Sequence, residues 1–559
     1  MKFKLGRHRR KSSCSAAPLL SLLSSLTLAL SWGVVIPSAL AAKRVTIRLG
    51  PFEQAIAITD LERFAKTGKL SSGLQLYAPI LTPQVREVLN RRLQLDPKLA
   101  DKIIDDVLRS PTGKQLIDSL GVAIPNSTLP QLQAAASVAV RQANGLSVVG
   151  FLRAYPKENI TVDASSVIAL ALQFNPTYWQ SEALSPLLER ELAVASDTPF
   201  KPAFDPARGG SQTVQQQTLF LLDRQRNRTI PVDLYWGKGV QPTLPTQQPL
   251  VVISHGFGAD RKFLAYLARH LASYGLTVAA LEHPGSNASW VARMSGGSNL
   301  AELLPGKEFV DRPKDVSFLL DELAKLNQQP GPLQGKLNTQ QVSVIGHSLG
   351  GYTALALAGA ELNLEELRQF CKGSIVFRQA PGDWLQCAAA DLPDRKLQLR
   401  DKRVKSAIAL NPLIGNLFGK TGLTQVTTPV LLLGGTEDAV TPLINNQLRP
   451  FTQLGGSKYL LTAIGGTHLS IGDSVNLSGQ ATASTIVKER RGEETKSLRQ
   501  LISGVSLAFI KQLTPEAKNY EPFLTPAYAQ SLSTPELPLR LNTELPASIT
   551  PLIEVVVKP

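Results

Sequence analysis

Cysteine and histidine are both scarce in this sequence of 559 residues, and their scarcity limits the chemistry that the chain can carry. Of the three cysteines, Cys14 precedes a long apolar run instead of closing it, which excludes a lipoprotein signal. With only six histidines, a role that needs an imidazole can be assigned by elimination. The composition, 43% hydrophobic and 18% charged, excludes overall disorder, and the length allows two or more domains.

Acidic residues are missing from the first 11 positions, which carry six lysines and arginines. An uncharged run rich in Leu and Ala follows over residues 12–42, with Ala39-Leu40-Ala41 near its end. This order predicts a secretory signal peptide over residues 1–42, cleaved after about Ala41, and a periplasmic or secreted protein. Because the run is long enough to span a bilayer, an uncleaved anchor is the alternative. Cleavage lowers the net charge from +15 to +9.

The remaining positive charge lies in short clusters, such as residues 224–228 and 400–405. Such clusters are typical of solvated faces, and no nucleic-acid-binding motif accompanies them, so we expect no nucleic-acid partner. Contact with a membrane surface or the cell envelope stays open.

Two cysteines, Cys371 and Cys387, remain after loss of the signal. An even number in an oxidising compartment predicts a disulfide between them, with two buried free thiols as the alternative. The bridge would close a loop of about 15 residues and contribute about 3 kcal/mol.

Residues 43–195 are predicted to form a mostly helical domain that contains no His and no Cys. An opening hairpin is expected over residues 45–50 and 54–58, followed by a helix with a capping box at residues 59–62. Further helices are expected from Thr82-Pro83 and Asp96-Pro97, and over 130–143, 146–155 and 177–193. A linker rich in Pro and Gly, residues 196–214, follows.

Residues 215–513 alternate short apolar runs with helical stretches, after an antiparallel pair at 218–223 and 230–236. This pattern predicts an α/β fold with a mostly parallel central sheet and helices on both faces. An amphipathic helix over residues 495–513 closes it. The spacers 286–315 and 360–403 are expected to be lid-like insertions, because long loops in compact domains tend to cover sites. Residues 514–559, which are rich in proline, are expected to form an extended tail.

The stretch VSVIGHSLGG (342–351) places a serine between two glycines, after an apolar run and before a helix of small residues. That is the pattern of a nucleophile elbow, which predicts Ser348 as a nucleophile with an exposed hydroxyl. A plain Gly-Ser turn is the structural alternative. Since a serine hydroxyl needs a general base, one of the histidines must reach it.

His468 is the histidine that follows the last predicted parallel strand on a short glycine-rich loop, and elimination selects it as the base. Asp438, in the loop after the strand at 429–435, is predicted to orient the imidazole, with Glu437 as its competitor. The oxyanion is expected to bind the main-chain N–H groups of Phe257 and Leu349. His255 is interpreted as a structural residue of the turn that holds Phe257.

The motifs HGFG, GHSLGG, GTED and GGTH occur in the order that α/β-hydrolases show, and residues 255–287 with 312–323 are closer still. This part resembles the branch that contains dienelactone hydrolase-like proteins and platelet-activating factor acetylhydrolases. Residues 43–195 resemble a helical domain of unknown function that precedes such hydrolases in bacterial exported proteins. The resemblance to the acetylhydrolases implies a triad acid at position 411. This chain has Asn411 there, and an amide cannot provide the carboxylate charge, so the acid is expected one strand later, at Asp438.

We therefore expect an exported serine hydrolase that cleaves carboxylic esters, such as a short-acyl lipid, a phospholipid or a soluble ester. No metal or organic cofactor is needed for this chemistry. A peptidase or thioesterase with the same triad is the enzymatic alternative. A non-catalytic envelope-binding protein on a hydrolase scaffold is the other.

Overall fold

A computed structural model of the chain describes most of residues 42–549. The described stretches are 42–49, 52–77, 123–140, 147–163, 184–195, 202–238, 247–294, 304–331, 333–373, 380–473 and 489–549, with a few single residues between them. The chain divides into two compact units. Of the described residues, those up to 89 and those from Ile124 to Val162 belong to the first, and those from 120 to 123 and from Asp163 onward belong to the second. The predicted signal peptide and the helices expected from Thr82 and Asp96 lie outside the described residues.

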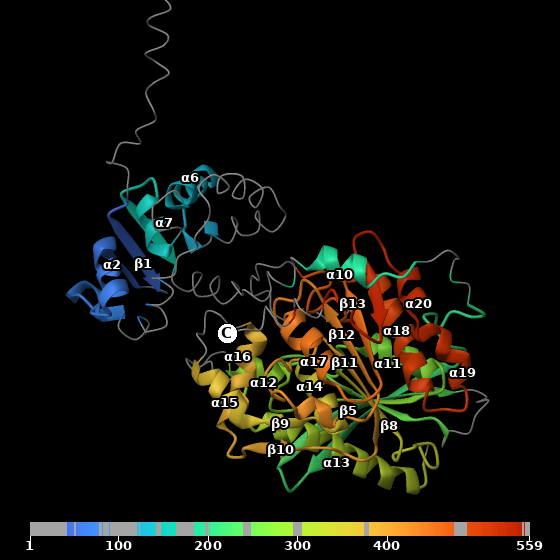
Figure 1. Ribbon diagram of the computed structural model, residues 1–559. Coiled ribbons are helices and arrows are strands. Elements are labelled where there is room, and N and C mark those ends of the chain that lie inside the picture. The colour runs from blue at the N-terminus through green and yellow to red at the C-terminus, as the bar shows by residue number, and fades with distance from the viewer. Residues whose placement is uncertain are drawn as a thin grey trace, which may run out of the picture. The chain divides into compact units, whose positions relative to one another are not determined.

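The first unit contains a small sheet, in the order β2-β1-β3, as well as helices (Figure 1). The predicted hairpin is confirmed, since β1 and β2 pair antiparallel with Val45 opposite Ile56. The sequence did not predict the third strand, β3, which joins the sheet from about 110 residues downstream of β1. The elements are β1 (Arg44–Leu49), β2 (Phe52–Ala57), α2 (Ile58–Thr67), η2 (Ser72–Tyr77), α6 (Leu129–Val140), α7 (Val148–Ala154) and β3 (Asn159–Asp163).

The predicted capping box at Thr59 is also wrong. Helix α2 begins one residue earlier, at Ile58, and no side chain caps it. Thr59 therefore lies within the first turn. The apolar residues Ile58, Leu61 and Phe64 are buried on one face, which shows that packing of this face sets the helix start.

The second unit is built on a nine-stranded sheet in the order β14-β13-β12-β11-β8-β6-β7-β5-β4. Pairing is parallel from β13 through β7, and antiparallel at β14, β5 and β4. The predicted fold class, a mostly parallel sheet of the α/β-hydrolase type, is thus confirmed. Its strands are β4 (Thr213–Asp223), β5 (Arg228–Lys238), β6 (Leu250–Ser254), β7 (Thr277–Leu281), β8 (Val342–His347), β11 (Val404–Leu410), β12 (Val430–Gly435), β13 (Lys458–Ala463) and β14 (Leu539–Asn542).

Alternate side chains of the central strands enter two different cores, which explains why these strands read as continuous apolar runs. In β6, Val252 belongs to one core and Ile253 to the other. Helices α13, α14 and α17 cover the first face, and α11 and α18 cover the second (Figure 1). These helices are α11 (Ala265–Ser273), α13 (Glu308–Gln328), α14 (Leu349–Ala358), α17 (Arg449–Gln453) and α18 (Lys496–Lys511).

Helix α10 (Ser185–Glu191) belongs to the sheet-bearing unit, so the predicted domain boundary at residue 195 lies too far along the chain. Leu188 and Leu192 are buried in the first core. The guanidinium of Arg540 also donates to the main-chain oxygen of Glu189 at 3.1 Å.

The C-terminal segment is part of the fold, which corrects the expectation of an extended tail from residue 514. Strand β14 pairs with β13, with Leu539 opposite Ala463. Phe523 and Tyr528 are buried in the second core. Prolines begin two of the short helices and so mark turns between compact elements. These elements are α19 (Ala517–Tyr520), η10 (Glu521–Leu524) and α20 (Pro526–Ser531).

The two predicted lid segments have different structures. Residues 286–315 include the short helix α12 (Ala288–Met294), but from Glu308 onward they form the buried start of α13, so that part is no lid. Residues 360–403 carry β9, which pairs antiparallel with β10, and the disulfide between Cys371 and Cys387. The elements here are β9 (Glu361–Asn363), α15 (Leu364–Gly373), α16 (Pro381–Gln386), η6 (Cys387–Asp391) and β10 (Lys396–Gln398).

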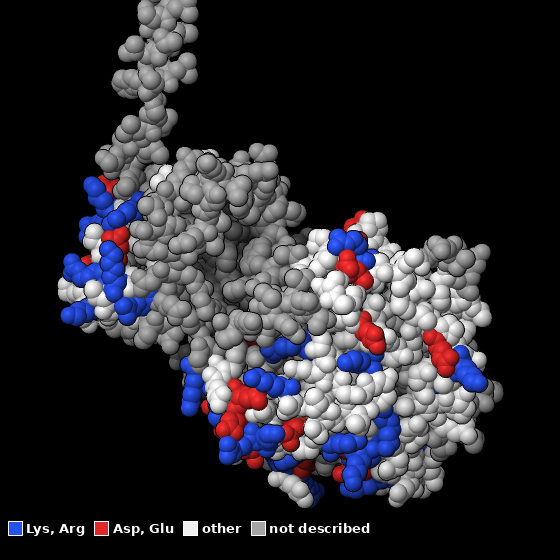
Figure 2. Space-filling model, in the orientation of Figure 1, with Lys and Arg blue, Asp and Glu red and all other residues white. Residues whose placement is uncertain are grey.

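Charged residues of both signs lie side by side on the visible face of this unit (Figure 2). Arg395 lies 2.8 Å from Glu365, and Lys396 lies 2.8 Å from Glu361. In the part of the chain that the structure describes, no helix is both long and apolar enough to cross a bilayer. The remaining short helices are η7 (Gly422–Gln425), η8 (Ile444–Leu448) and η9 (Gly492–Thr495).

Candidate active site

Ser348 stands at the sharp turn between β8 and α14, at the carboxyl edge of the parallel strands. Its φ of 53° and ψ of −117° are unusual for a residue with a side chain. The surrounding structure holds this conformation, since the Ser348 N–H donates to the Leu410 oxygen at 3.0 Å and the Leu413 N–H donates to the Ser348 oxygen at 3.0 Å. This turn geometry matches the elbow that the sequence pattern predicts. The predicted exposure of the hydroxyl is wrong, because Ser348 is buried and only 4% exposed.

The two glycines of the elbow are required by close approach of the main chain. A Cβ atom on Gly346 would lie 1.9 Å from the Gly350 oxygen. A Cβ atom on Gly350 would lie 2.0 Å from the Ser254 oxygen at the end of β6. Because both obstacles are main-chain atoms, no side-chain movement could relieve the clash.

Asp438 and His468 are in direct contact at the ends of the neighbouring strands β12 and β13. The Nδ1 atom of His468 lies 2.8 Å from Oδ2 of Asp438, and the Asp438 side chain is fully buried. Since a carboxylate only accepts, Nδ1 carries the proton and Nε2 keeps its lone pair. Asp438 is itself held by the N–H groups of Val440 and Thr441 at 2.9 and 2.7 Å.

Opposing effects act on the pKa of His468. Burial disfavours the charged imidazolium, but the Asp438 carboxylate favours it through charge and a hydrogen bond, and the Glu489 carboxylate adds to this. The net result is a pKa above the ordinary value for histidine. His468 is therefore stabilised in the protonated form that a general base acquires.

The loop that carries His468 is attached to the elbow through His347, the residue before Ser348. His347 Nε2 donates to the main-chain oxygen of His468 at 3.0 Å, and the two rings lie 4.7 Å apart. His347 also stacks on Phe263. Burial, and then the neighbouring His468, lower the pKa of His347 well below its ordinary value, so it is a neutral donor.

Asn411, at the position where the resemblance to the acetylhydrolases implies an acid, supports the same loop. Its side-chain amide donates to the oxygens of Thr467 and His468 at 3.2 and 3.1 Å. It is fully buried and has a φ of 44°. The structure therefore brings Asp438, and not residue 411, to the imidazole nitrogen.

The predicted oxyanion turn lies against the elbow. A Cβ atom on Gly256 would lie 3.2 Å from Cβ of Ser348, and Gly258 adopts a φ of 69°. Within the described residues, the N–H of Phe257 donates to no main-chain acceptor. Leu349 is the first residue of α14, where main-chain N–H groups have no partner within the helix. Both groups thus remain available to an anion.

Sequence reasoning did not identify Glu489, which lies in a charged run without any motif. Its Oε2 accepts from the N–H of Leu469 at 2.9 Å and from the Thr467 hydroxyl at 2.5 Å. Burial raises the pKa of Glu489 above its usual value, although the Thr467 hydrogen bond and the nearby His468 oppose this. The competitor Glu437 lies 3.5 Å from Arg490, and Asp438 is the acid at His468.

The other described histidines have structural surroundings. His270 lies in helix α11, and burial lowers its pKa to about 4. Burial also lowers the pKa values of His255 and His283 well below the ordinary range, with the Arg312 cation adding to the effect at each. Among the described residues, no group of three His, Cys, Asp or Glu side chains is arranged to hold a metal ion.

Known protein families match two parts of the chain. Residues 41–163 match the family described as "Alpha/beta hydrolase of unknown function (DUF1400)". Residues 193–303, which include the oxyanion turn, match the family "Platelet-activating factor acetylhydrolase, isoform II". These matches agree with the resemblances read from the sequence.

Two curated relatives are similar over a shorter stretch. The platelet-activating factor acetylhydrolase of Cavia porcellus is 29% identical over 138 residues, and that of Canis lupus familiaris is 31% identical over 137 residues. Each alignment covers 19% of this chain and only 31% of the relative. Together with the sheet topology, these findings show that the chain is an α/β-hydrolase that resembles the platelet-activating factor acetylhydrolase branch.

Proposed function

We propose that this chain is an exported serine hydrolase that cleaves carboxylic esters through an acyl-enzyme. The observation that carries the proposal is the 2.8 Å contact between His468 Nδ1 and Asp438 Oδ2, in a loop bonded to the residue before Ser348. Acyl transfer requires a nucleophile and an oriented imidazole on neighbouring segments, and the bond from His347 to the His468 main chain connects these two segments here.

In this mechanism the Ser348 hydroxyl attacks the ester carbonyl carbon while His468 Nε2 takes the hydroxyl proton. Asp438 keeps Nδ1 protonated and stabilises the imidazolium that forms. The N–H groups of Phe257 and Leu349 bind the oxygen that becomes negative, which contributes several kcal/mol at the transition state. His468 then protonates the departing alcohol, and a water molecule activated by the same imidazole releases the acid.

Esters are favoured as the substrate class because the similar relatives are named platelet-activating factor acetylhydrolases. The proposed substrates are a short-acyl lipid, a phospholipid or a soluble ester. The disulfide between Cys371 and Cys387 supports an oxidising compartment, as the proposed export requires.

The proposal is tested with Ser348→Ala on p-nitrophenyl acetate and butyrate. The variant is expected to fold normally and to lose hydrolysis and labelling by a fluorophosphonate probe. Ser317→Ala, which removes a hydroxyl of α13 that donates to Asp401 at 2.8 Å, is the matched control and should keep both. Wild-type turnover by Ser348→Ala would refute the mechanism.

A panel of esters, thioesters and aminoacyl anilides then tests the substrate class. We expect esters to be cleaved faster than the anilides, because an amide nitrogen donates into the carbonyl more strongly than an ester oxygen and an amide anion is a poorer leaving group than an alkoxide. Preferential cleavage of the anilides would replace the esterase with a peptidase. Absence of both turnover and probe labelling in the folded wild-type protein would favour a binding protein on this scaffold.

A further inference from the structure

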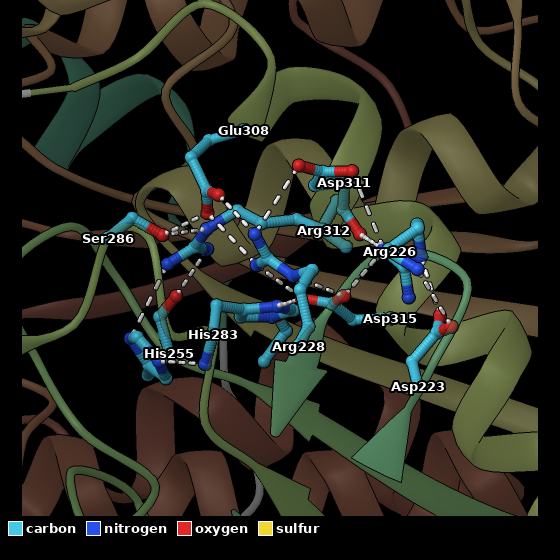
Figure 3. Close-up of polar contacts among 12 residues, drawn as sticks. Asp223, Arg226, Arg228, His255, His283, Ser286, Glu308, Asp311, Arg312 and Asp315 are labelled. Carbon is cyan, nitrogen blue, oxygen red and sulfur yellow. Dashed lines mark hydrogen bonds and ion pairs between the residues drawn. The ribbon is translucent and has the colours of Figure 1, made fainter. Parts of the chain in front are cut away.

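A second Ser-His-Asp chain lies buried beneath the oxyanion turn. Ser254 Oγ is 2.9 Å from His283 Nε2, and His283 Nδ1 is 2.9 Å from Asp315 Oδ2 (Figure 3 shows the His283–Asp315 end). All three residues are fully buried. Asp315 is also bonded to Arg226 and Arg228 at 2.7 and 2.8 Å. These three residues have no solvent access, and arginines neutralise the carboxylate. The Ser254–His283–Asp315 hydrogen bonds therefore anchor the end of β6 instead of performing chemistry.

Arg312 connects this buried network to the oxyanion turn. It projects from α13 and is fully buried. Its Nη1 donates to the main-chain oxygen of His255 at 2.8 Å (Figure 3). Its Nη2 lies 3.4 Å from the Gly256 oxygen. Its Nε donates to the Ser286 hydroxyl at 2.8 Å, and the main-chain oxygen of Ser286 accepts from the Gly258 N–H at 2.9 Å. One guanidinium thus contacts the turn directly and through Ser286.

The tautomer of His255 strengthens the same arrangement. Its Nε2 accepts from the His283 N–H at 3.0 Å, so the ring proton is on Nδ1. Nδ1 then donates to the Gly256 oxygen at 2.6 Å. The Gly256 carbonyl is therefore held by a neutral donor and lies beside a cation on its interior side.

The orientation of this carbonyl determines where the Phe257 N–H points. The peptide unit between Gly256 and Phe257 is planar, and the described chain contains no cis peptide bond. In a trans peptide the N–H points opposite to the C=O. Because Arg312 and His255 hold the carbonyl inward, the N–H is directed away from them. Hydrogen bonds to the carbonyl also polarise the peptide and strengthen its N–H as a donor.

We propose that Arg312 is a positioning residue for the oxyanion site, which fixes and polarises the Gly256–Phe257 peptide so that its N–H meets the developing negative charge. The inference rests on the proposed esterase function. It deepens that function by assigning the preorganisation of the site to a buried cation that touches neither the substrate nor the triad.

The network also explains how a cation can remain at this depth. Burial lowers the pKa of Arg312 to about 10, and the carboxylates of Glu308 and Asp315 oppose a larger fall. Glu308 approaches through Ser286, whose hydroxyl donates to Oε2 at 2.8 Å. Arg312 is therefore still charged near neutral pH.

The test compares Arg312→Met with Arg228→Met, measured on the full chain with p-nitrophenyl butyrate. Arg228 is nearly as buried and binds Glu308 and Asp315, but it does not touch the turn, which makes it a matched control for stability. We expect kcat of Arg312→Met to fall roughly 10- to 100-fold with little change in KM, because the lost interaction acts at the transition state. The phosphonylation rate with a fluorophosphonate should fall in parallel.

Arg228→Met should lower the melting temperature at least as much and leave kcat close to the wild-type value. Arg312→Lys, which keeps the charge without the planar fork, should recover part of the loss. Wild-type kcat and phosphonylation in Arg312→Met, or an equal kcat loss in Arg228→Met, would overturn the proposal. If Arg312→Met does not fold, a folded Arg312→Lys with wild-type kcat would overturn it as well.

Failure of this inference is distinguishable from failure of the proposed function. If Ser348→Ala abolishes turnover while Arg312→Met retains it, the esterase function is supported and the positioning role of Arg312 is refuted. If Ser348→Ala retains turnover, the proposed esterase mechanism is itself refuted.

Discussion

The side-chain amide of Asn411 donates to the main-chain oxygen of His468 at 3.1 Å. It makes a second such bond, at 3.2 Å, to the oxygen of Thr467. Residue 411 follows β11, one strand before the strand that leads to Asp438. In this chain the side chain after β11 secures the histidine loop, and the side chain after β12 supplies the carboxylate.

Asn411→Ala is expected to lower kcat on p-nitrophenyl butyrate by roughly 10- to 100-fold. The His468 loop loses two hydrogen bonds, and small displacements of a catalytic group reduce the rate strongly. The measurement is steady-state kinetics beside a thermal unfolding curve.

The paired variant Asp438→Asn with Asn411→Asp tests whether the acid could return to residue 411. We expect no recovery over Asp438→Asn alone, since a carboxylate there would face two carbonyl oxygens. Restored activity would show that residue 411 can reach the imidazole.

The acid limb of the pH profile should report His468. Turnover needs the neutral imidazole, and the pKa of His468 lies above its ordinary 6.5. Hence kcat/KM should fall as the pH drops through a pKa above that value.

Asp438→Asn should lower kcat by about 10⁴-fold, as expected when the orienting carboxylate of a triad is lost.

Glu489→Gln should shift the acid limb to lower pH, because removal of a negative charge lowers the pKa of His468 while the amide oxygen can still accept from Leu469. Glu437→Gln is the matched control, since Glu437 pairs with Arg490 and should leave the limb in place. An acid limb that stays in place, or moves to higher pH, in Glu489→Gln would contradict the assigned electrostatic role.

The C-terminal strand should contribute to stability as a core element. Leu541 in β14 is 1% exposed, and Leu541→Ala is expected to lower the free energy of unfolding by about 2–5 kcal/mol. Leu222→Ala, at a leucine that is 52% exposed, should change it by less than about 0.5 kcal/mol. Equal effects of the two substitutions in denaturant titrations would support an extended tail over residues 514–559 and contradict a core role for β14.

The disulfide should stabilise the segment between α15 and η6. Cys371 and Cys387 lie 16 positions apart in the sequence, a spacing for which a crosslink contributes about 3 kcal/mol through loop closure. Reductant should therefore lower the melting temperature of the wild-type protein. The double variant Cys371→Ala/Cys387→Ala should melt lower and show no response to reductant; a wild-type protein insensitive to reductant, with two titratable thiols, would argue against the bridge.

Elements with a strong local pattern were predictable from sequence. The parallel strands are apolar on both faces, and the β4–β5 pair flanks a polar turn, so a mostly parallel sheet that begins with an antiparallel pair could be predicted. The elements that were missed are short or depend on distant partners. Strand β3 has five residues and joins β1, and β14 has four residues and joins β13, so neither carries a periodic signal of its own.

The sequence by itself determined the mostly parallel sheet, because local periodicity shows it, and the elbow at Ser348, because glycine is required at close contacts. It also determined the predicted order Ser348, Asp438, His468, because histidine is scarce. Only the tertiary structure decided that Asn411 and Glu489 brace the His468 loop and that Arg312 holds the Gly256 carbonyl. The physical reason is that a polar side chain carries no local sign of its partner. Whether it is solvated or buried against a charge depends on segments that lie side by side only after the sheet has formed.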